Sequence, residues 1–391
     1  MLKTQELGLM ALVRSALTRR KVELPEGFSL QAVVPMVRKH QIAPIIMQAL
    51  NYYNLPEQPM FVQAMMPTVA MSLSVFESQN RESEKLFAAL QERGIDYAPL
   101  KGTLLKKLYP SEDLRSMADV DVLVRTGDRE KLDKLMRELG YTSEGESDHE
   151  YNWRKGYVHM ELHKSPVPSY DREYYAYYGD GWKFFAPIAP KAHRYAMRSE
   201  DEYVYLFTHY AKHFRDGGIG VKHLTDLWAF LKAKPDMDRE YIRGELRKLH
   251  LEKFHENVLA AIACWFDDAP MSETSETILH AILGGAAYGV KEMQQRAEAV
   301  RISPNGKSSK LRWTTKKIFL PYKNMCSKYP FLRYLPFLLP IMWVVRWVTA
   351  IVCKPKKLSQ NVKDAKNMSQ ESVDEYRAYL DSVGLRFEGK G

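Results

Sequence analysis

The sequence contains few cysteines, and their spacing excludes the common cysteine-based scaffolds. Cys264, Cys326 and Cys353 are odd in number, far apart and without a Cys-x-x-Cys pair. This pattern argues against a disulfide framework or a zinc site and fits a reducing compartment, so we expect a cytoplasmic protein. Residues 1–20 lack the long apolar run and the small-residue cleavage site of a signal peptide, and they fit an amphipathic helix instead.

Long uncharged apolar runs are also missing, although one segment approaches the length of a membrane span. Residues 329–353 are strongly apolar, but Arg333 and Arg346 lie within them, and Pro336 and Pro340 are expected to break a helix. We therefore expect no transmembrane span. The segment is interpreted as a buried or partner-covered hairpin, or as a peripheral contact that lies in a membrane interface.

The composition is that of an ordinary globular protein with an excess of positive charge. The 391 residues are 45% hydrophobic and 27% charged, which suits two or three domains with apolar cores. The formal net charge of +9 favours polyanionic partners, namely nucleotides, nucleic acid or acidic lipid, and does not choose among them.

The spacing of apolar residues predicts an α+β fold, in which a small mixed-sheet core is embedded in mostly helical domains. The predicted regions are an N-terminal helical region (1–92), an α/β core (93–165), a helical domain (166–302) and a basic, aromatic C-terminal region with a polar tail (303–391). In the last region, residues 303–317 are basic and rich in turn formers, and a helix is expected near residues 369–383.

The core is predicted to run strand, helix, strand, helix, strand. The predicted strands are residues 95–100, 119–124 and 157–163, because apolar and polar side chains alternate there or glycines flank a short apolar run. A short helix is predicted at residues 103–109, and Asp128 is a candidate cap for the second helix.

Three carboxylates on these strands form the strongest candidate site. Asp119 and Asp121 are two residues apart on a predicted strand, so their side chains share a face. Side-by-side carboxylates repel each other unless a cation lies between them, and Mg²⁺ or Mn²⁺ with oxygen ligands is the expected ion. Glu161 points to the polar side of the next predicted strand, with His163 two positions further, and can complete a metal-binding triad if the strands pair.

The turn before the first short helix is a candidate phosphate site. Lys101, Gly102 and Thr103 follow the first strand, where a glycine lets the backbone approach an anion and a helix start presents free N–H groups. Lys101 and Arg115 add positive charge. Together with the acidic strands, this order of elements predicts a phosphoryl- or nucleotidyl-transfer site.

Each of these motifs also has a plain structural interpretation. An isolated Asp-x-Asp is most often a pair of solvated carboxylates, and Lys-Gly-Thr is compatible with a simple turn. His209 and His213 share a helix face but lack the zinc-protease signature, so packing histidines are favoured over a metal site. A solvated helix face is slightly favoured over a nucleotide cleft for a group of downstream residues, Lys212, Arg215, Lys222 and Asp226.

The segment from Leu100 to Val124, LKGTLLKKLYPSEDLRSMADVDVLV, resembles the family of uncharacterised nucleotidyltransferases. That family shows a Leu-Lys-Gly turn, a Tyr-Pro, an Arg and an Asp-x-Asp strand, and belongs to the superfamily with the polymerase beta fold. Glu161-Leu162-His163 is similar to its acidic-Leu-His element, and the similarity extends over most of the chain.

The resemblance implies that Asp119 and Asp121 bind metal, that Glu161 completes the catalytic triad, and that Gly102 and Thr103 contact nucleotide phosphates. It implies a metal-dependent transfer of a nucleotidyl group from an NTP, with ATP as the first candidate, to an unidentified hydroxyl-bearing acceptor, releasing pyrophosphate. Two alternatives stay open. One is a non-catalytic nucleotide-binding regulatory module, and the other is a membrane-peripheral or nucleic-acid-binding protein that acts through its C-terminal region.

Overall fold

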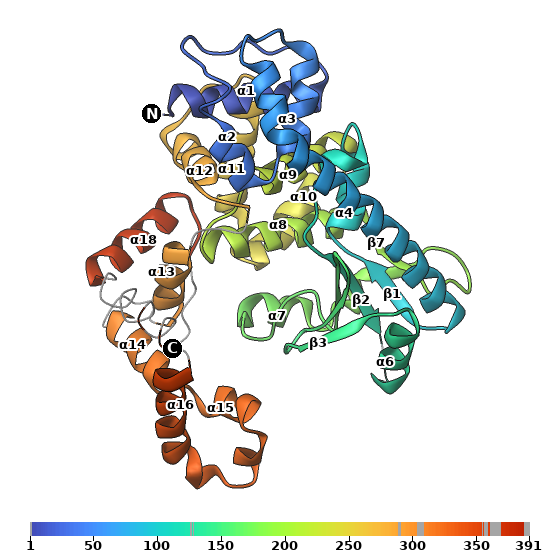
Figure 1. The fold of residues 1–391 in the computed structure, drawn as a ribbon, viewed down its shortest axis with the longest axis vertical. Helices are drawn as coiled ribbons and strands as arrows, with labels where there is room; N and C mark the ends of the chain where they lie inside the picture. The colour runs from blue at the N-terminus through green and yellow to red at the C-terminus, as the bar shows by residue number, and fades with distance from the viewer. Residues whose placement is uncertain are drawn as a thin grey trace. The chain divides into compact units, whose positions relative to one another are not determined.

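The computed structural model describes residues 2–125, 127, 129–287, 291–302, 309–353, 355, 359 and 369–386. The chain divides into two units, which are treated separately below. The first comprises residues 1–212 and 219–288, and the second comprises residues 213–218 and 289–391. The expected α+β class, a small mixed sheet among many helices, is confirmed (Figure 1).

The first unit begins with helices and then alternates helices with strands. Its elements are α1 (Thr4–Thr18), α2 (Val34–His40), α3 (Ala43–Ala49), α4 (Gln58–Glu92), β1 (Asp96–Pro99), α5 (Gly102–Leu105), β2 (Val120–Arg125), α6 (Arg129–Glu138), β3 (Thr142–Glu146), β4 (Glu150–Lys155), β5 (Val158–His163), α7 (Arg172–Tyr178), β6 (Phe185–Pro187), β7 (Tyr195–Met197), α8 (Ser199–Arg215), α9 (Val221–Ala233), α10 (Arg239–Lys248), α11 (Glu252–Phe266) and α12 (Glu273–Gly284). Short 3-10 turns include Leu50–Tyr52, Lys106–Leu108, Glu112–Leu114 and Trp182–Phe184.

The main sheet has five strands in the order β1-β2-β5-β4-β3. Only β2 and β5 run parallel, and the other neighbours are antiparallel. A separate hairpin is formed by β6 and β7. This order places the two predicted acidic strands side by side at the centre of the sheet.

The two faces of the sheet differ sharply in polarity. One face packs against α4 and α6 around a core whose members include Leu86, Val122, Leu135, Trp153 and Met160. Removing a large core side chain of this kind typically costs about 3–5 kcal/mol. Because successive strand residues alternate, the opposite face carries the polar side chains of β2 and β5. The hydrophobic pattern therefore determines which face is available for chemistry.

Helix α4 is one of two helices that are long and apolar enough to cross a membrane by length and composition alone; the other spans Pro336–Cys353. In the first unit, α4 contributes Leu86 and Leu90 to the sheet core, and its buried Glu82 accepts a hydrogen bond from Lys155 of β4 at 2.6 Å. The second half of α4 is thus a supporting helix of the sheet.

The second unit is helical. It contains α13 (Lys291–Ile302), α14 (Ser309–Ile318), α15 (Tyr322–Lys328), α16 (Leu339–Cys353) and α18 (Gln370–Ser382), with 3-10 turns at Pro330–Arg333 and Pro336–Leu338. The helix predicted near residues 369–383 is confirmed.

Several sequence-based expectations require correction. The core has five strands instead of three, because β3 is exposed throughout and β4 lacks a regular apolar alternation. Residues 309–318 form a helix where a turn-rich stretch was expected. Pro340 does not break α16, since it lies in the first turn, where proline is tolerated. The candidate cap Asp128 lies outside the described residues.

Candidate active site

The acidic strands pair in the register that brings the predicted carboxylates together. Asp121 of β2 lies directly opposite Glu161 of β5 in the parallel ladder. Asp119 is two residues earlier, immediately before β2, and so belongs to the same face. The predicted alignment of the two polar strand faces is confirmed.

Two side chains contact the same carboxylate oxygen of Asp121. Lys101 Nζ donates to Asp121 Oδ1 at 2.7 Å, and His163 Nε2 lies 2.8 Å from the same atom. Burial alone would raise the pKa of Asp121, but the ammonium of Lys101 and the imidazole of His163 outweigh it and hold that pKa well below its ordinary value. No described residue donates a hydrogen bond to the second oxygen, Oδ2, which is therefore available to a ligand.

The other two carboxylates lack such compensation. Burial raises the pKa of Asp119, and repulsion from Asp121 adds to the rise. Burial and repulsion from Asp119 and Asp121 raise the pKa of Glu161 to about 8. The nearest cationic candidates to Glu161 are His163 Nε2 at 3.7 Å and His159 Nδ1 at 3.8 Å, both too far for a hydrogen bond. The site is therefore short of positive charge.

The turn after β1 brings the backbone close to this acidic centre. Lys101 adopts φ +40°, a conformation that side-chain-bearing residues rarely adopt and that costs of order 1–3 kcal/mol. Its ion pair with Asp121 helps to hold that conformation. A Cβ atom on Gly102 would lie 2.6 Å from Met117 Sδ and 2.8 Å from Arg115 Nη1, so any larger residue would force Met117 and the ion-paired Arg115 to move.

Thr103 lies in the first turn of α5 and has an unusual hydroxyl. The side chain is buried, and Oγ1 has no hydrogen-bond partner among the described residues. A buried hydroxyl without a partner is costly, and a ligand that supplies an acceptor would remove the cost. Helix α5 has only four residues. Any contribution to anion binding would therefore come from its first free N–H groups and from Thr103 Oγ1.

Arg115, predicted as a possible phosphate partner, forms an ion pair with a carboxylate of the helical region. It is buried and makes a two-point ion pair with Asp226 of α9, with Nε–Oδ1 and Nη2–Oδ2 distances of 2.8 Å. The Tyr109 hydroxyl also donates to Asp226 Oδ1 at 2.7 Å. Arg115 thus supports the wall behind Gly102, and its direct contact with a phosphate stays a prediction.

Lys222 is a site neighbour for which the sequence favoured a solvated helix face. It lies at the start of α9, is buried, and donates from Nζ to the Ser116 carbonyl oxygen at 3.3 Å. Burial and repulsion from Arg115 lower the pKa of Lys222 to about 8, while the carboxylates of Asp119 and Asp121 act in the opposite direction. The favoured solvated-face interpretation is therefore wrong for Lys222, as it is for the buried Arg215 and Asp226.

Among the described residues, three groups of side chains could hold a metal ion, and they share the polar face of the sheet. They are Asp119–His159–Glu161, Asp121–Glu161–His163 and His149–Glu150–His163. His209 and His213 are in none of these groups and lie half-buried on α8. The tyrosines of residues 170–178 lie largely on helix α7.

This arrangement of a glycine turn, an Asp-x-Asp strand and a parallel acidic strand defines the class of nucleotidyltransferases. A family model described as "uncharacterised nucleotidyltransferase" matches residues 26–267, which is more than half of the chain. The chain belongs to this family, and the suspected resemblance is confirmed. Searches of curated proteins and of solved structures returned no match.

Family membership gives the protein a nucleotidyltransferase-type function, with a nucleoside triphosphate as substrate. Nucleotidyltransferases typically use divalent metal ions, and acidic groups that could bind one are present on the sheet.

Proposed function

We propose that the protein transfers a nucleotidyl group from an NTP to a hydroxyl-bearing acceptor, with Asp119, Asp121 and Glu161 as its catalytic carboxylates. The observation that carries this proposal is the parallel register of Asp121 and Glu161, with Asp119 on the same face. ATP is the first nucleotide to test.

The donor set fits a divalent metal ion such as Mg²⁺ or Mn²⁺. Asp119 and Glu161 make no hydrogen bond through their carboxylates to any described residue, and Asp121 Oδ2 is likewise open. Three crowded carboxylates repel one another, which is consistent with the raised pKa of Asp119 and Glu161. These three residues would hold the metal, which when bound neutralises developing charge on the phosphate oxygens.

The remaining chemistry is assigned to side chains of the chain itself. The acceptor oxygen forms a bond to the α-phosphorus, the bond from this phosphorus to the α–β bridging oxygen breaks, and pyrophosphate leaves. Glu161, which lies opposite Asp121 in the parallel ladder, accepts the acceptor's proton. Gly102 and Thr103 bind phosphate oxygens through backbone N–H groups and the unpaired hydroxyl.

The test is transfer of label from each α-labelled NTP, with Mg²⁺ or Mn²⁺, into the protein itself and into a host lysate. The Asp119→Ala/Asp121→Ala double variant is compared with the wild type. The chain offers a matched control in a second Asp-x-Asp, Asp236 and Asp238. Because Asp238 caps α10 through Tyr241 N at 2.9 Å, the control is Asp236→Ala/Asp238→Asn, which preserves the cap.

Label that depends on Asp119 and Asp121 but not on the control pair supports the proposal. Equal label in both variants would remove these carboxylates from the mechanism. If neither the wild type nor the variants transfer label, calorimetric titration with ATP and Mg²⁺ follows. ATP binding without label transfer to the protein itself or to any lysate fraction would favour the non-catalytic regulatory module instead.

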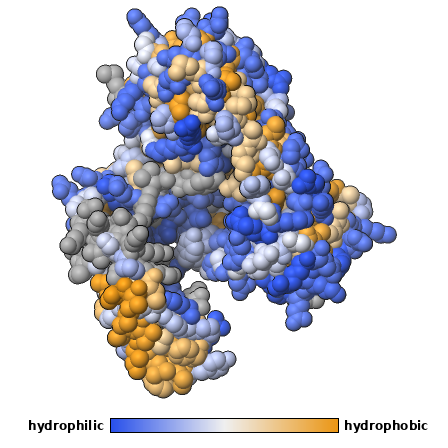
Figure 2. All heavy atoms as spheres, viewed as in Figure 1, coloured by the Kyte–Doolittle hydropathy of each residue, from blue (hydrophilic) through white to orange (hydrophobic). Residues whose placement is uncertain are grey.

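A second proposal concerns membrane contact, and it is favoured by the exposed face of α16. Ile341, Val344, Val348, Ile351 and Val352 recur at helical spacing and are each more than half exposed. Figure 2 shows hydrophobic atoms gathered over α16. On another face of α16, Trp343 Nε1 donates to the Leu320 carbonyl oxygen at 3.0 Å, and Trp347 Nε1 donates to the Ile318 carbonyl oxygen at 2.9 Å. Helix α16 has no buried residue, whereas Leu332 before it is buried in a cluster against which Met342 and Trp343 of α16 pack.

The charge of the surrounding chain indicates which partner would cover this face. From Arg301 to Lys363 the sequence has fourteen Lys or Arg residues and no Asp or Glu. An apolar helix face in a basic segment is complementary to an anionic lipid surface, and the anionic leaflet of cell membranes faces the cytoplasm. We therefore propose a cytoplasmic protein that binds the membrane peripherally through residues 329–353.

Vesicle co-sedimentation tests this contact. Wild-type protein is expected to sediment with phosphatidylcholine vesicles that contain phosphatidylserine, and the Val344→Asp/Val348→Asp variant is expected to stay in solution. Met271→Asp, at an exposed apolar position of the first unit, is the control. Equal sedimentation of all three proteins, or binding of a single-stranded RNA probe but not of vesicles, would overturn the membrane proposal.

A further inference from the structure

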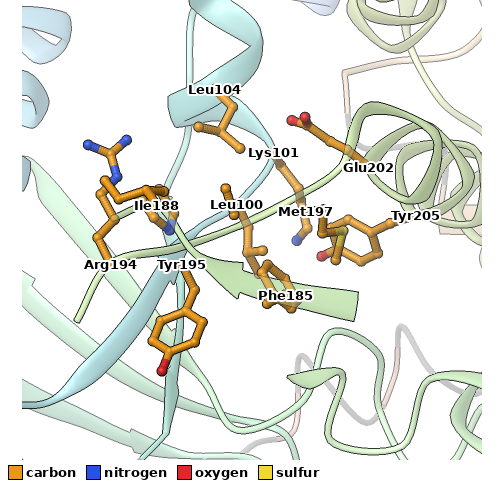
Figure 3. A pocket seen from close by; sticks show the side chains of 12 residues that line it. Leu100, Lys101, Leu104, Phe185, Ile188, Arg194, Tyr195, Met197, Glu202 and Tyr205 are labelled. Atoms are coloured by element: carbon orange, nitrogen blue, oxygen red, sulfur yellow. The ribbon is translucent and has the colours of Figure 1, made fainter. Parts of the chain in front are cut away.

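A pocket of about 370 Å³ lies beside the acidic centre in the first unit. Its walls come from the end of β1, from α5, from the β6–β7 hairpin and from α8 (Figure 3). The apolar and aromatic part of the lining includes Leu100, Leu104, Phe185, Tyr195, Met197 and Tyr205. Pockets of this kind, mainly apolar with a few polar groups, are typical of small-molecule sites, and flat aromatic walls suit a planar ring.

Glu202 is the one acidic side chain of the lining, and it reaches in from α8 (Figure 3). Its carboxylate makes no hydrogen bond or ion pair with any described residue. Burial raises its pKa to about 7, partly offset by the distant charge of Lys234. The two cations of the lining are engaged elsewhere: Lys101 pairs with Asp121, and the Arg194 guanidinium lies 5.9 Å from the centre of the Phe87 ring.

The pocket is connected to the acidic centre by shared residues. Lys101 lines the pocket and also donates to Asp121 at 2.7 Å. Tyr205 lines the pocket as well, and its pKa of about 12 reflects burial and the nearby charges of Lys101, Asp121 and Glu161. A ligand that occupies the pocket therefore lies next to the carboxylates of the proposed reaction.

The strand order indicates that the pocket is on the side of the NTP and not on the side of the acceptor. The pocket adjoins β1 and α5, the elements proposed to hold the phosphates, whereas Glu161 lies on β5, on the other side of β2. The proposed base thus faces the acceptor from the far side of Asp121. An unpaired carboxylate among apolar side chains repels a triphosphate but accepts hydrogen bonds from a heterocycle.

We propose that this pocket binds the nucleobase of the NTP and that Glu202 selects bases that carry an exocyclic amino group. The inference rests on the proposed nucleotidyl transfer. Adenine N6, cytosine N4 and guanine N2 are exocyclic amino groups that can donate to a carboxylate, whereas uracil has no exocyclic amino group. Hydrogen bonds to a charged group make a difference of about ten- to hundred-fold in affinity, so UTP is the nucleotide discriminated against.

Calorimetric titration of the full chain with ATP, CTP, GTP and UTP tests this inference, with Ca²⁺ in place of Mg²⁺ to measure binding without transfer. The wild type is expected to bind the three amino-bearing nucleotides at least about ten-fold more tightly than UTP. Glu202→Gln removes the charge with almost no change in size, and its amide can both donate and accept, so the discrimination against UTP should collapse. Glu200→Gln, two residues earlier on α8, is the matched control.

A second variant tests the location independently of hydrogen bonding. Met197→Trp would fill the pocket and is expected to lower the affinity for all four nucleotides at least ten-fold. An unchanged unfolding transition is the check that the variant is folded. Unaltered discrimination in Glu202→Gln, unaltered binding in Met197→Trp, or no binding of any NTP to the wild type would overturn the inference. Loss of discrimination in a protein that transfers no label would leave the pocket intact and refute only the transfer reaction.

Discussion

Glu161 provides the sharpest test of the proposed acidic centre, because its protonation is linked to folding. In the folded protein its pKa is raised to about 8 by burial and by Asp119 and Asp121, from an ordinary value of 4.5. The folded state therefore binds this proton more tightly than the unfolded chain does. The associated stability is fully present below about pH 4.5 and is lost as the pH rises towards 8.

The size of the effect follows from the same values. At about 1.4 kcal/mol per pH unit, the interval from 4.5 to about 8 corresponds to roughly 5 kcal/mol. The repulsion is shared among three carboxylates, so the share that one substitution removes is smaller. We expect Glu161→Gln to be more stable than the wild type by about 2–3 kcal/mol at pH 8 in EDTA, and nearly equal to it at pH 4.5.

The assay is urea unfolding of both proteins at the two pH values, with Glu92→Gln, at the exposed end of α4, as the control for loss of a surface charge. Adding Mn²⁺ at pH 8 should stabilise the wild type more than Glu161→Gln, because a bound cation relieves the same repulsion. A difference between the two proteins that is the same at both pH values, or a destabilised Glu161→Gln at pH 8, would refute the reasoning.

Three further substitutions test neighbouring parts of the site. Lys101→Met leaves the buried Asp121 without its ammonium partner and should destabilise the metal-free protein by about 3–5 kcal/mol in urea unfolding, with part of the loss restored by Mn²⁺. Gly102→Ala should cost about 1–3 kcal/mol, because Arg115 Nη1 would lie 2.8 Å from the new Cβ, and should abolish label transfer. Asp226→Ala leaves the Arg115 guanidinium buried and unpaired, and thermal unfolding should report a loss of about 3–5 kcal/mol.

Each of these has a control in the same unit. Lys134→Met removes an exposed lysine of α6, and Gly244→Ala adds a Cβ to α10 where no atom lies within 4 Å. Asp236→Ala removes an exposed carboxylate. If a control variant is destabilised as much as its counterpart, the loss reflects a general effect of the substitution and not the contacts at the site.

Strong local patterns were sufficient for the elements that carry the site. The period-two alternation around Asp121 and Glu161 predicted β2 and β5, and the glycine after β1 predicted the turn at Lys101. Strands β3 and β4 were missed, because their side chains are mostly exposed and leave no hydrophobic alternation to detect. The helical propensity of residues 309–318 was obscured by their many basic and polar side chains.

By itself, the sequence determined which residues could do chemistry, since side-chain spacing along a strand fixes which carboxylates share a face. Only the tertiary structure decided their partners. Long-range pairing placed Lys101 and His163 on Asp121, diverted Arg115 to Asp226, and buried Lys222 beside the site. These contacts join residues 20 to 111 positions apart. They depend on strand order and helix packing, which no local pattern encodes.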